Sequence, residues 1–251
     1  MKETGRLIAV VTGGNKNLGR ALSMDLANQG VFVVILAKDG ESNNKIVSEI
    51  RSLGGVAEAR DVDLRNTEEI KKAFFEILGK YGAIDILINN AAVSYFETAK
   101  DIDEQKCADM IDINLKAVYL SCKITLGSML NRGAGTIINI SSIYGLRADK
   151  KTSVYSMTKF GLVGYTKGLH ADYRDKGIRA KVFCPTAFGE DAVLKTKTLS
   201  REIIKSASDP KDLYNEYSIL SKKVGPLKIL LIERKAWAGK RTRVSYILKI
   251  V

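Results

Sequence analysis

The chain has 251 residues, of which 45% are hydrophobic, and it carries a formal net charge of +12. This size and apolar content support one sizeable core, so we expect a single domain over residues 1–251. The apolar segments are too short to span a membrane, and Leu7–Val11 is too short for a signal-peptide core, which predicts a cytoplasmic protein with no membrane partner. Cys107, Cys122 and Cys184 form no Cys-x-x-Cys pair, so neither a disulfide framework nor a metal site is expected.

The positive charge favours an anionic partner, such as a phosphorylated cofactor, an acidic carrier protein or, less specifically, nucleic acid. From Lys222 to the end, nine Lys and Arg residues occur with a single acid, Glu233. Because no nucleic-acid motif accompanies this charge, we expect a solvated basic surface and rank nucleic-acid binding last.

Apolar runs of strand length alternate with helical stretches along the chain. The predicted strands are Leu7–Val11, Val31–Leu36, Val56–Ala59, Ile84–Asn89, Thr136–Ile140, Arg179–Cys184 and a last candidate at Arg243–Ile247. Such alternation predicts an α/β fold, namely a Rossmann-like doubly wound parallel sheet of about seven strands with helices on both faces.

Helix signals agree with this pattern. Gly30 and Gly54 are expected to end the first two helices, and Asn66 begins a capping box that opens the third. Two longer helices are expected at Ile102–Asn131 and Ser153–Lys176.

The first predicted strand leads directly into the glycine-rich turn Thr12-Gly13-Gly14-Asn15-Lys16-Asn17-Leu18-Gly19, which a helical stretch follows. A turn of this kind points backbone N–H groups and the positive end of a helix dipole at one spot, which suits the pyrophosphate of a dinucleotide. Taken alone, the turn is equally consistent with a sharp bend. In an open α/β sheet, ligands bind beyond the carboxyl ends of the strands, so Gly13, Asn89, Ser142 and Pro185 should meet at one crevice.

Tyr155 and Lys159 stand one helical turn apart, and Ser142 ends a strand thirteen residues before Tyr155. The spacing predicts an ammonium beside the phenol, which should lower the phenol pKa toward neutrality, while Ser142 bonds a substrate oxygen. Tyr119 and Lys123 have the same spacing, but Lys106 occupies the position thirteen before Tyr119 and cannot replace a serine.

These motifs, in this order, resemble those of the short-chain dehydrogenase/reductase family over nearly the whole chain. The matching blocks are Thr12-Gly13-x-x-x-Asn17-x-Gly19, Asn89-Asn90-Ala91-Ala92, Asn114, Asn139-Ile140-Ser141-Ser142, Tyr155-Ser156-Met157-Thr158-Lys159 and Cys184-Pro185. Leu230 to Val244 is similar to the family's last helix and strand.

The resemblance implies a role for each catalytic position. Tyr155 would be the general acid/base, Lys159 would lower its pKa and hold the nicotinamide ribose, Ser142 would orient the substrate carbonyl, and Asn114 would help to position a proton-relay water. Taken singly, Asn114 is also consistent with a helix irregularity and Ser142 with a capping hydroxyl. His170 has no catalytic partner in view and is expected to be structural.

The resemblance also implies the cofactor-binding residues. They are Thr12, Gly13, Lys16, Asn17, Leu18 and Gly19 in the turn, Lys38 after the second strand, the pair Asp61-Val62, and Asn89, Ala91, Tyr155, Lys159 and Pro185. Ala37 occupies the position where NAD-preferring relatives carry an acid, while Lys16 and Lys38 supply two cations for a 2′-phosphate. NADP(H) is therefore expected, with NAD(H) as the alternative if Asp39 reaches the ribose.

Several positions depart from the family pattern. Asn17 replaces a glycine, Ala92 and Thr186 replace two more, and Glu190 stands where a threonine is usual. Two hypotheses follow. The first is an NADP(H)-dependent oxidoreductase acting on a small carbonyl or alcohol substrate, anionic or carrier-linked. The second is a catalytically weak dinucleotide-binding regulator or scaffold with the same fold. Residues 186–225 are expected to cover the substrate, and the two long helices predict a homodimer or homotetramer.

Overall fold

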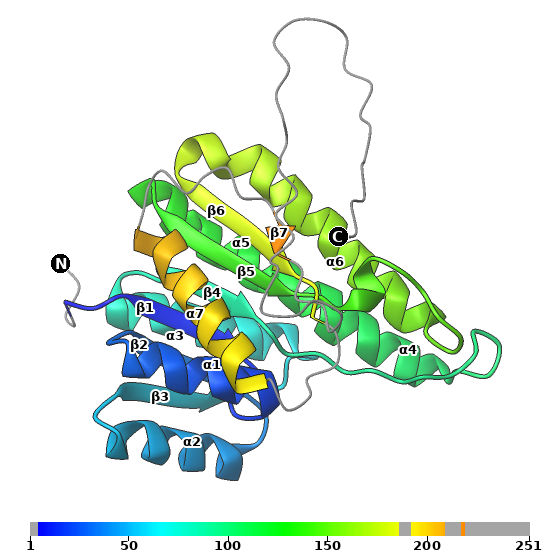
Figure 1. Ribbon diagram of the computed structural model, residues 1–251, viewed down its shortest axis with the longest axis horizontal. Helices are drawn as coiled ribbons and strands as arrows, with labels where there is room; N and C mark the ends of the chain where they lie inside the picture. The colour runs from blue at the N-terminus through cyan, green and yellow to red at the C-terminus, as the bar shows by residue number, and fades with distance from the viewer. Residues whose placement is uncertain (1–4, 186–191, 209–216, 219–251) are drawn as a thin grey trace, which may run out of the picture.

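The computed structural model of the protein describes residues 5–185, 192–208 and 217–218 (Figure 1). Its strands form one sheet in the order β3-β2-β1-β4-β5-β6-β7, and every neighbouring pair is parallel. The strands are β1 Ile8–Thr12, β2 Phe32–Ala37, β3 Val56–Asp61, β4 Ile86–Asn89, β5 Gly135–Ile140, β6 Ile178–Phe183 and β7 Tyr217–Ser218. The predicted doubly wound parallel sheet is confirmed.

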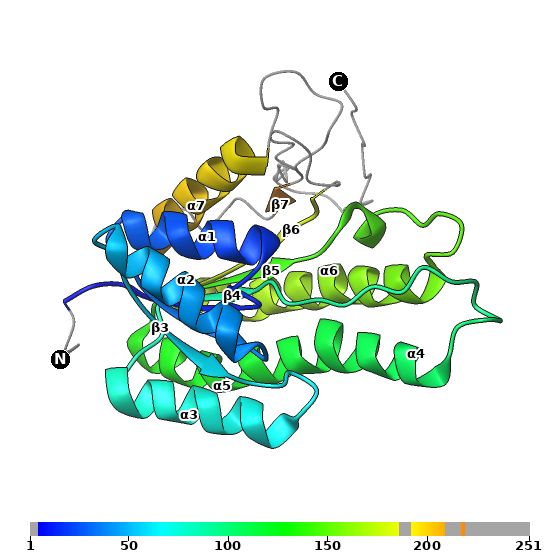
Figure 2. The same ribbon diagram turned by 90° about the horizontal axis from the view of Figure 1, so that it is seen from below.

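Helices cover both faces of this sheet (Figure 2). They are α1 Asn17–Asn28, α2 Gly40–Ser52, α3 Thr67–Tyr81, α4 Glu104–Ile111, α5 Ala117–Arg132, α6 Ser153–Tyr173 and α7 Ala192–Ser208. Viewed nearly along the sheet, α1, α2 and α7 lie on one side, and α3, α4 and α5 lie on the other.

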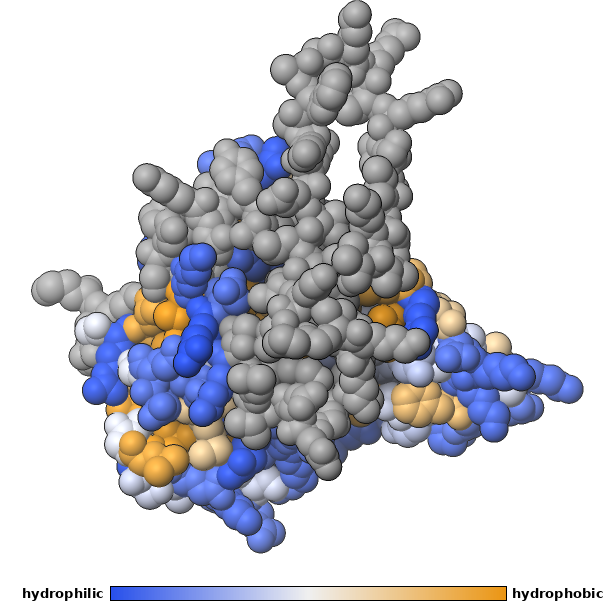
Figure 3. Space-filling model, in the orientation of Figure 1, coloured by the Kyte–Doolittle hydropathy of each residue, from blue (hydrophilic) through white to orange (hydrophobic). Residues whose placement is uncertain are grey.

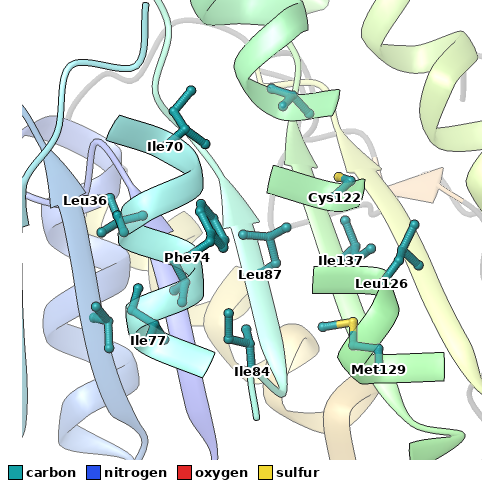
Figure 4. Packing of buried hydrophobic residues seen from close by; sticks show 14 of the residues in the cluster. Leu36, Ile70, Phe74, Ile77, Ile84, Leu87, Cys122, Leu126, Met129 and Ile137 are labelled. Carbon is teal, nitrogen blue, oxygen red and sulfur yellow. The ribbon is translucent and has the colours of Figure 1, made fainter. Parts of the chain in front are cut away.

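The strands β1, β2, β4, β5 and β6 are buried on both faces, so their side chains alternate between two cores rather than between core and solvent. In β1, Ile8 and Val10 join the core beneath α3, α5 and α6, whereas Ala9 and Val11 join the core beneath α1, α2 and α7. Figure 4 shows the first core, in which Phe74 of α3 packs beside Leu87 of β4. Burial on both faces explains why the sequence shows continuous apolar runs.

The order in which strands are added to the sheet reverses between β1 and β4. These two strands are parallel neighbours, although β2 and β3 separate them in sequence. Thr12 pairs with Asn89 at this point, and Asn89 pairs with Asn139 on the next strand. The chain therefore runs outward from β1 in one direction and from β4 in the other, which opens a crevice at the carboxyl ends of these strands.

The predicted helix Ile102–Asn131 is interrupted. A π-helical turn, Asp112–Lys116, separates α4 from α5 and contains Asn114. The Asn114 side chain accepts a hydrogen bond from the Val93 amide (2.9 Å) and donates one to the Val93 carbonyl (2.9 Å). It also donates to the Thr158 hydroxyl at 3.1 Å. These three bonds accompany the local widening of the helix.

The carboxyl-terminal part differs from the sequence prediction. Residues 192–208, expected to cover the substrate, form α7 and pack against α1, where Ser200 contacts Asp25 and Gln29. The seventh strand is the two-residue β7, which pairs with β6. The strand predicted at Arg243–Ile247 and the basic stretch from Lys222 onward lie outside the described residues. None of the helices in the described part is long and apolar enough to cross a membrane.

Candidate active site

A cleft of about 1510 Å³ lies beyond the carboxyl ends of the strands. Ordinary small-molecule pockets occupy about 300–1,000 Å³, so this cleft has room for more than one small ligand. It extends from the turn Gly13–Gly19 past Ala37 and Val62 to Ser142, Tyr155, Lys159 and Pro185. The crevice predicted from the strand ends is thus present, with Gly13, Ser142 and Pro185 on its wall and Asn89 beneath it.

The turn at one end is shaped by glycines that no other residue could replace without a shift. Gly13 has a left-handed backbone (φ +62°) and its N–H donates to the Leu36 carbonyl at 2.8 Å. A Cβ built on Gly19 would lie 2.1 Å from the Gly13 carbonyl oxygen. Asn17 also adopts the left-handed region (φ +48°) and begins α1, so the turn forms with asparagine at this position.

Asn90 connects this turn to the end of β4. Its side-chain amide donates to the carbonyls of Thr12 (3.0 Å) and Gly13 (3.1 Å). In return, the Thr12 hydroxyl accepts from the backbone N–H groups of Asn90 and Ala91. Thr12 therefore supports the turn from below and does not line the cleft, whereas Ala91 does. Sequence reasoning missed Asn90, although it lies within the matched block that follows β4.

Asn89 likewise lies under the cleft. Its side chain donates to Asn139 on β5 at 2.8 Å, and Asn139 donates to Thr166 on α6 at 2.9 Å. All three residues are at least 98% buried. This chain of hydrogen bonds fixes α6, and hence the helix of Tyr155 and Lys159, against the sheet.

Asp61 lies away from the cleft, contrary to the sequence prediction for the pair Asp61-Val62. Its carboxylate accepts from Asn43 at 2.7 Å and stands over Gly40, where a Cβ would lie 2.6 Å from it. Val62 lines the cleft as expected, and the next acid, Asp63, lines it in place of Asp61. The strand β3 ends at Asp61, so Val62 and Asp63 leave the strand and turn toward the cleft.

Asp63 organises the basic residues at this end. Its carboxylate accepts from Lys38 (2.9 Å) and Arg65 (2.7 Å), and these hydrogen bonds, above all those from Arg65, hold its pKa well below the usual range. Lys38 and Arg65 both line the cleft. Arg65 was not singled out from the sequence, where it is one of many basic residues.

Lys16 pairs with Asp39 at 2.6 Å. Asp39 also caps α2 by accepting from the Ser42 amide at 3.1 Å, and the Lys16 contact is the main cause that keeps its pKa far below the usual value. Asp39 is not part of the cleft wall, whereas Lys16 and Lys38 are.

At the opposite end, three predicted residues meet. The Ser142 hydroxyl, at the end of β5, lies beside the Tyr155 phenol, whose pKa it lowers, and accepts from the Tyr144 amide at 3.2 Å. The Lys159 ammonium lies 5.6 Å from the centroid of the Tyr155 ring and donates to the Ile140 carbonyl at 3.1 Å. Lys159 is only 2% exposed, which is unusual for a lysine.

Burial dominates the titration of both groups. It raises the pKa of Tyr155, against the hydrogen bond from Ser142, which lowers it. Burial also lowers the pKa of Lys159 to about 8. The expected lowering of the Tyr155 pKa by Lys159 is therefore not seen, because burial of the phenol is the largest cause and raises that pKa.

Asn114 does not line the cleft. Its three hydrogen bonds hold Val93, which does line the cleft, against Thr158 of α6. Phe96, Tyr144 and Arg147 line the same end and were not predicted; the only sequence signal for Tyr144 and Arg147 was their place just after Ser142. Pro185 accepts from the Ile143 amide at 2.9 Å and thereby holds this turn in place. Glu190 and Thr186 lie outside the described residues.

Comparison with known proteins agrees with this geometry. Residues 7–199 match the sequence pattern of the short chain dehydrogenases, from β1 to the middle of α7. The chain belongs to the short-chain dehydrogenase family. It is therefore an oxidoreductase that acts on CH–OH and C=O groups.

Several relatives carry more specific names. The chain is 31% identical to a 3beta-hydroxysteroid dehydrogenase of Mediterraneibacter gnavus, over 88% of this chain and 81% of that protein. It is 34% identical to a cyclohexanol dehydrogenase of an Acinetobacter species, over 68% and 69% of the two chains. A metagenomic short-chain oxidoreductase solved in complex with NADP superposes with a TM-score of 0.79 at 26% identity, covering 85% of this chain and 96% of the other.

Proposed function

We propose that this short-chain dehydrogenase is an NADP(H)-dependent carbonyl reductase in which Tyr155 donates the proton to the substrate oxygen. One observation carries the proposal. The Tyr155 phenol lies beside the Ser142 hydroxyl, which lowers the phenol pKa, and beside the buried Lys159, on the wall of a cleft that begins at the glycine turn.

The proton chemistry favours reduction. Because burial raises the pKa of Tyr155, the phenol stays protonated at neutral pH and is ready to donate. A substrate carbonyl at this end would accept hydrogen bonds from Tyr155 and Ser142, and its oxygen would take the Tyr155 proton as its carbon gains hydride. The oxidative direction needs the phenolate and should therefore become faster as the pH rises.

Lys159 stabilises the phenolate that remains. Its pKa of about 8 leaves the ammonium mostly charged at pH 7. At the 5.6 Å that separates it from the ring centroid, and with an effective dielectric of about 20, the attraction for a phenolate is about 3 kcal/mol. This attraction is absent while Tyr155 is neutral, so it favours the state that forms after proton transfer.

The cleft fits a nicotinamide dinucleotide. At Gly19 a side chain would collide with the Gly13 carbonyl, and at Gly13 a Cβ would lie 3.0 Å from Ala91, so the turn leaves its backbone uncovered for a pyrophosphate. Gly13, Asn17, Leu18 and Gly19 would hold the pyrophosphate, and Ala91, Lys159 and Pro185 would hold the nicotinamide end. When bound, the nicotinamide supplies the hydride.

The adenosine end supports a preference for NADP(H). Lys16, Lys38 and Arg65 line it, and the acids that pair with them are partly exposed, so these ion pairs contribute little and can yield to a phosphate. Asp39 is the residue that would favour NAD(H). Its carboxylate already pairs with Lys16 and accepts from the Ser42 amide at the start of α2. We expect NADP to bind about tenfold or more tightly than NAD, measured by calorimetry. Arg65→Ala and Lys38→Ala should reduce this ratio, and Lys45→Ala, an exposed control on α2, should not.

The substrate is proposed to be a small carbonyl or alcohol compound, because two relatives are named for a hydroxysteroid and for cyclohexanol.

We further propose a homodimer or homotetramer. Ile111 on α4 and Met157 and Phe160 on α6 expose 38%, 50% and 45% of their surface, and Figure 3 shows hydrophobic patches on the α4 and α6 side of the molecule. Phe160→Glu should lower the mass measured by light scattering.

The test of the proposed function combines titration and turnover. Purified protein is titrated with NADPH and then assayed with a panel of ketones and aldehydes by the loss of absorbance of NADPH. Binding with turnover supports the proposal. Binding without turnover of any carbonyl or alcohol would favour the regulator or scaffold, and no binding would contradict both.

A further inference from the structure

Two aromatic rings flank the ring of Tyr155, the proposed proton donor. The Phe96 ring lies 5.6 Å from the Tyr155 ring, and the Tyr144 ring lies 6.2 Å from it, both in edge-to-face arrangements. Phe96 and Tyr144 are themselves 6.3 Å apart. Phe96 is 52% exposed although it is a large apolar side chain on the cleft wall. Aromatic surface left uncovered in a cleft indicates an apolar ligand.

The charges along the cleft are distributed unevenly. Both acids that line it, Asp63 and Asp109, contact Arg65 at the adenosine end. Lys16 and Lys38 also have acidic partners there. Arg147, in contrast, lines the aromatic end, and no acid among the residues that the structure describes pairs with its guanidinium.

Arg147 is held on the same turn as Tyr144. The turn Ile143–Gly145 follows Ser142, and the Arg147 amide donates to the Ile143 carbonyl at 3.1 Å. The residue that orients the substrate oxygen, an aromatic wall and an unpaired cation therefore come from six consecutive residues. This short stretch of backbone sets their spacing, and the bond from the Ile143 amide to the Pro185 carbonyl holds the turn in place.

We infer that the substrate of this enzyme carries an aromatic or other flat apolar ring together with a carboxylate, with Phe96 and Tyr144 contacting the ring and Arg147 pairing with the carboxylate. The inference rests on the proposed function, since it assumes that the reacting carbonyl lies at Tyr155. A guanidinium binds a carboxylate through two parallel hydrogen bonds and stacks well beside aromatic faces. A neutral substrate would leave Arg147 unused, and a substrate without a ring would leave Phe96 exposed.

The test uses substrates matched in shape and different in charge. The ratio of kcat/KM for 4-acetylbenzoate to that for 4-acetylbenzamide is measured with NADPH, and the 3-substituted pair is measured in parallel because the side chain of Arg147 is long. The wild-type enzyme should prefer the carboxylates by about tenfold, and the preference should fall with added salt because Arg147 is exposed. Arg147→Gln should abolish the preference by lowering kcat/KM for the carboxylates far more than for the amides, while Arg147→Lys should keep part of it.

Lys150→Gln is the matched control. It removes the same charge three residues away from an exposed position that does not line the cleft, so the carboxylate preference should be kept. Phe96→Ala should lower kcat/KM for both members of each pair by a similar factor. Equal use of carboxylate and amide by the wild-type enzyme, or equal loss in the Lys150 variant, would overturn the inference while the proposed function stood.

Binding provides a second readout that does not need turnover. The affinity of benzoate-type ligands for the protein with NADP is measured by calorimetry in wild type and Arg147→Gln. If no carbonyl is reduced but carboxylate binding is lost in the variant, the proposed reaction is wrong and the carboxylate site stands. If carboxylates bind equally to both proteins, the site is wrong whatever the turnover.

Discussion

Two Tyr-x-x-x-Lys pairs occur in this protein, and they show how little the spacing itself determines. In both, the lysine ammonium lies over the tyrosine ring, 5.6 Å from the centroid for Lys159 on Tyr155 and 5.8 Å for Lys123 on Tyr119. The local geometry of an α-helix produces this contact wherever the two residues stand four apart. The two pairs are therefore nearly identical at the level of the helix.

Their surroundings differ. Lys159 is 2% exposed and Lys123 is exposed, and Tyr155 lies on the cleft wall whereas Tyr119 is 47% exposed on α5 beside Tyr165. Of the two tyrosines, Tyr155 has a serine hydroxyl close enough to lower the pKa of its phenol. Chemistry at one pair and not the other is thus a property of tertiary packing, which supplies burial, Ser142 and access to the cleft.

Replacement of the phenol should give the largest difference between the pairs. Tyr155→Phe removes the proton donor and should lower kcat about a thousandfold, since a positioned acid contributes about 10²–10⁴-fold. NADPH binding should persist because the glycine turn is untouched. Tyr119→Phe is the matched control and should keep wild-type rates. Steady-state kinetics with NADPH and a ketone measure both, and similar activity in the two variants would refute the assignment.

Removal of the serine should have the next largest effect. Ser142→Ala deletes the hydrogen bond that lowers the pKa of Tyr155, so that pKa should rise further and the pH profile of alcohol oxidation should move to higher pH. The loss of a donor to the substrate oxygen should also lower kcat about a hundredfold. Lys106→Ala, at the equivalent position before Tyr119, should leave the profile in place. If the pH profile of Ser142→Ala did not shift, Ser142 would have no influence on the pKa of Tyr155.

The buried charge of Lys159 should lower the free energy of unfolding, although the same residue supports turnover. Burial lowers its pKa from 10.5 to about 8, so the folded protein holds fewer protons than the unfolded chain between these values and its stability rises with pH across that window. At pH 7 the charged form therefore costs about 3 kcal/mol. Lys159→Met should remove this cost and lose about 1 kcal/mol from the bond to Ile140, so its free energy of unfolding should rise by about 2 kcal/mol.

Urea denaturation at pH 7 and pH 10 measures the effect of Lys159. The gain in Lys159→Met should be present at pH 7 and largely absent at pH 10. Lys123→Met is the exposed control and should change stability by less than about 0.5 kcal/mol at either pH. A less stable Lys159→Met at pH 7 would show that the ammonium is better compensated than its burial indicates.

Much of the fold could be predicted from sequence because its causes are local. Strands buried on both faces give continuous apolar runs, and caps such as Asn66 mark helix starts, so six strands and the order of elements were correct. α7 and β7 were not predicted, because α7 is amphipathic and polar in part, while β7 has only two residues and carries no periodicity. The helix and strand predicted between Leu230 and Ile247 lie outside the described residues. The π-helical turn at Asn114 depends on bonds to Val93 and Thr158, which are distant in sequence.

The position of a site residue could be predicted from sequence where that residue follows a strand. Other site residues were harder to place. Gly13, Ser142 and Pro185 follow strands and were placed correctly on the cleft. Asp63 was not singled out because sequence alone does not show that β3 ends at Asp61 and that the residues after it reach the cleft wall. The cofactor contact expected of Asp61 stays a prediction. The upward shift of the Tyr155 pKa was not predicted, since the charge of Lys159 is visible in the sequence and the burial of the phenol is not.

The smallest expected effect concerns the close packing that joins Ser142 to α6. A Cβ on Gly145 would lie 2.3 Å from the Ser141 hydroxyl and 2.8 Å from the Lys159 carbonyl, so Gly145→Ala should push the Ser142 turn away from the helix. Overpacking of this kind costs about 1–3 kcal/mol, and we expect about 1–2 kcal/mol here together with a lower kcat. Gly164 lies in α6, and an added Cβ there would have nothing within 4 Å. Gly164→Ala should therefore stabilise the protein by about 0.5–1 kcal/mol and keep activity. Thermal denaturation and steady-state kinetics of the two variants compare them directly. If Gly145→Ala kept full activity, the approach of this turn to α6 would not be what distinguishes the Tyr155 pair from the Tyr119 pair.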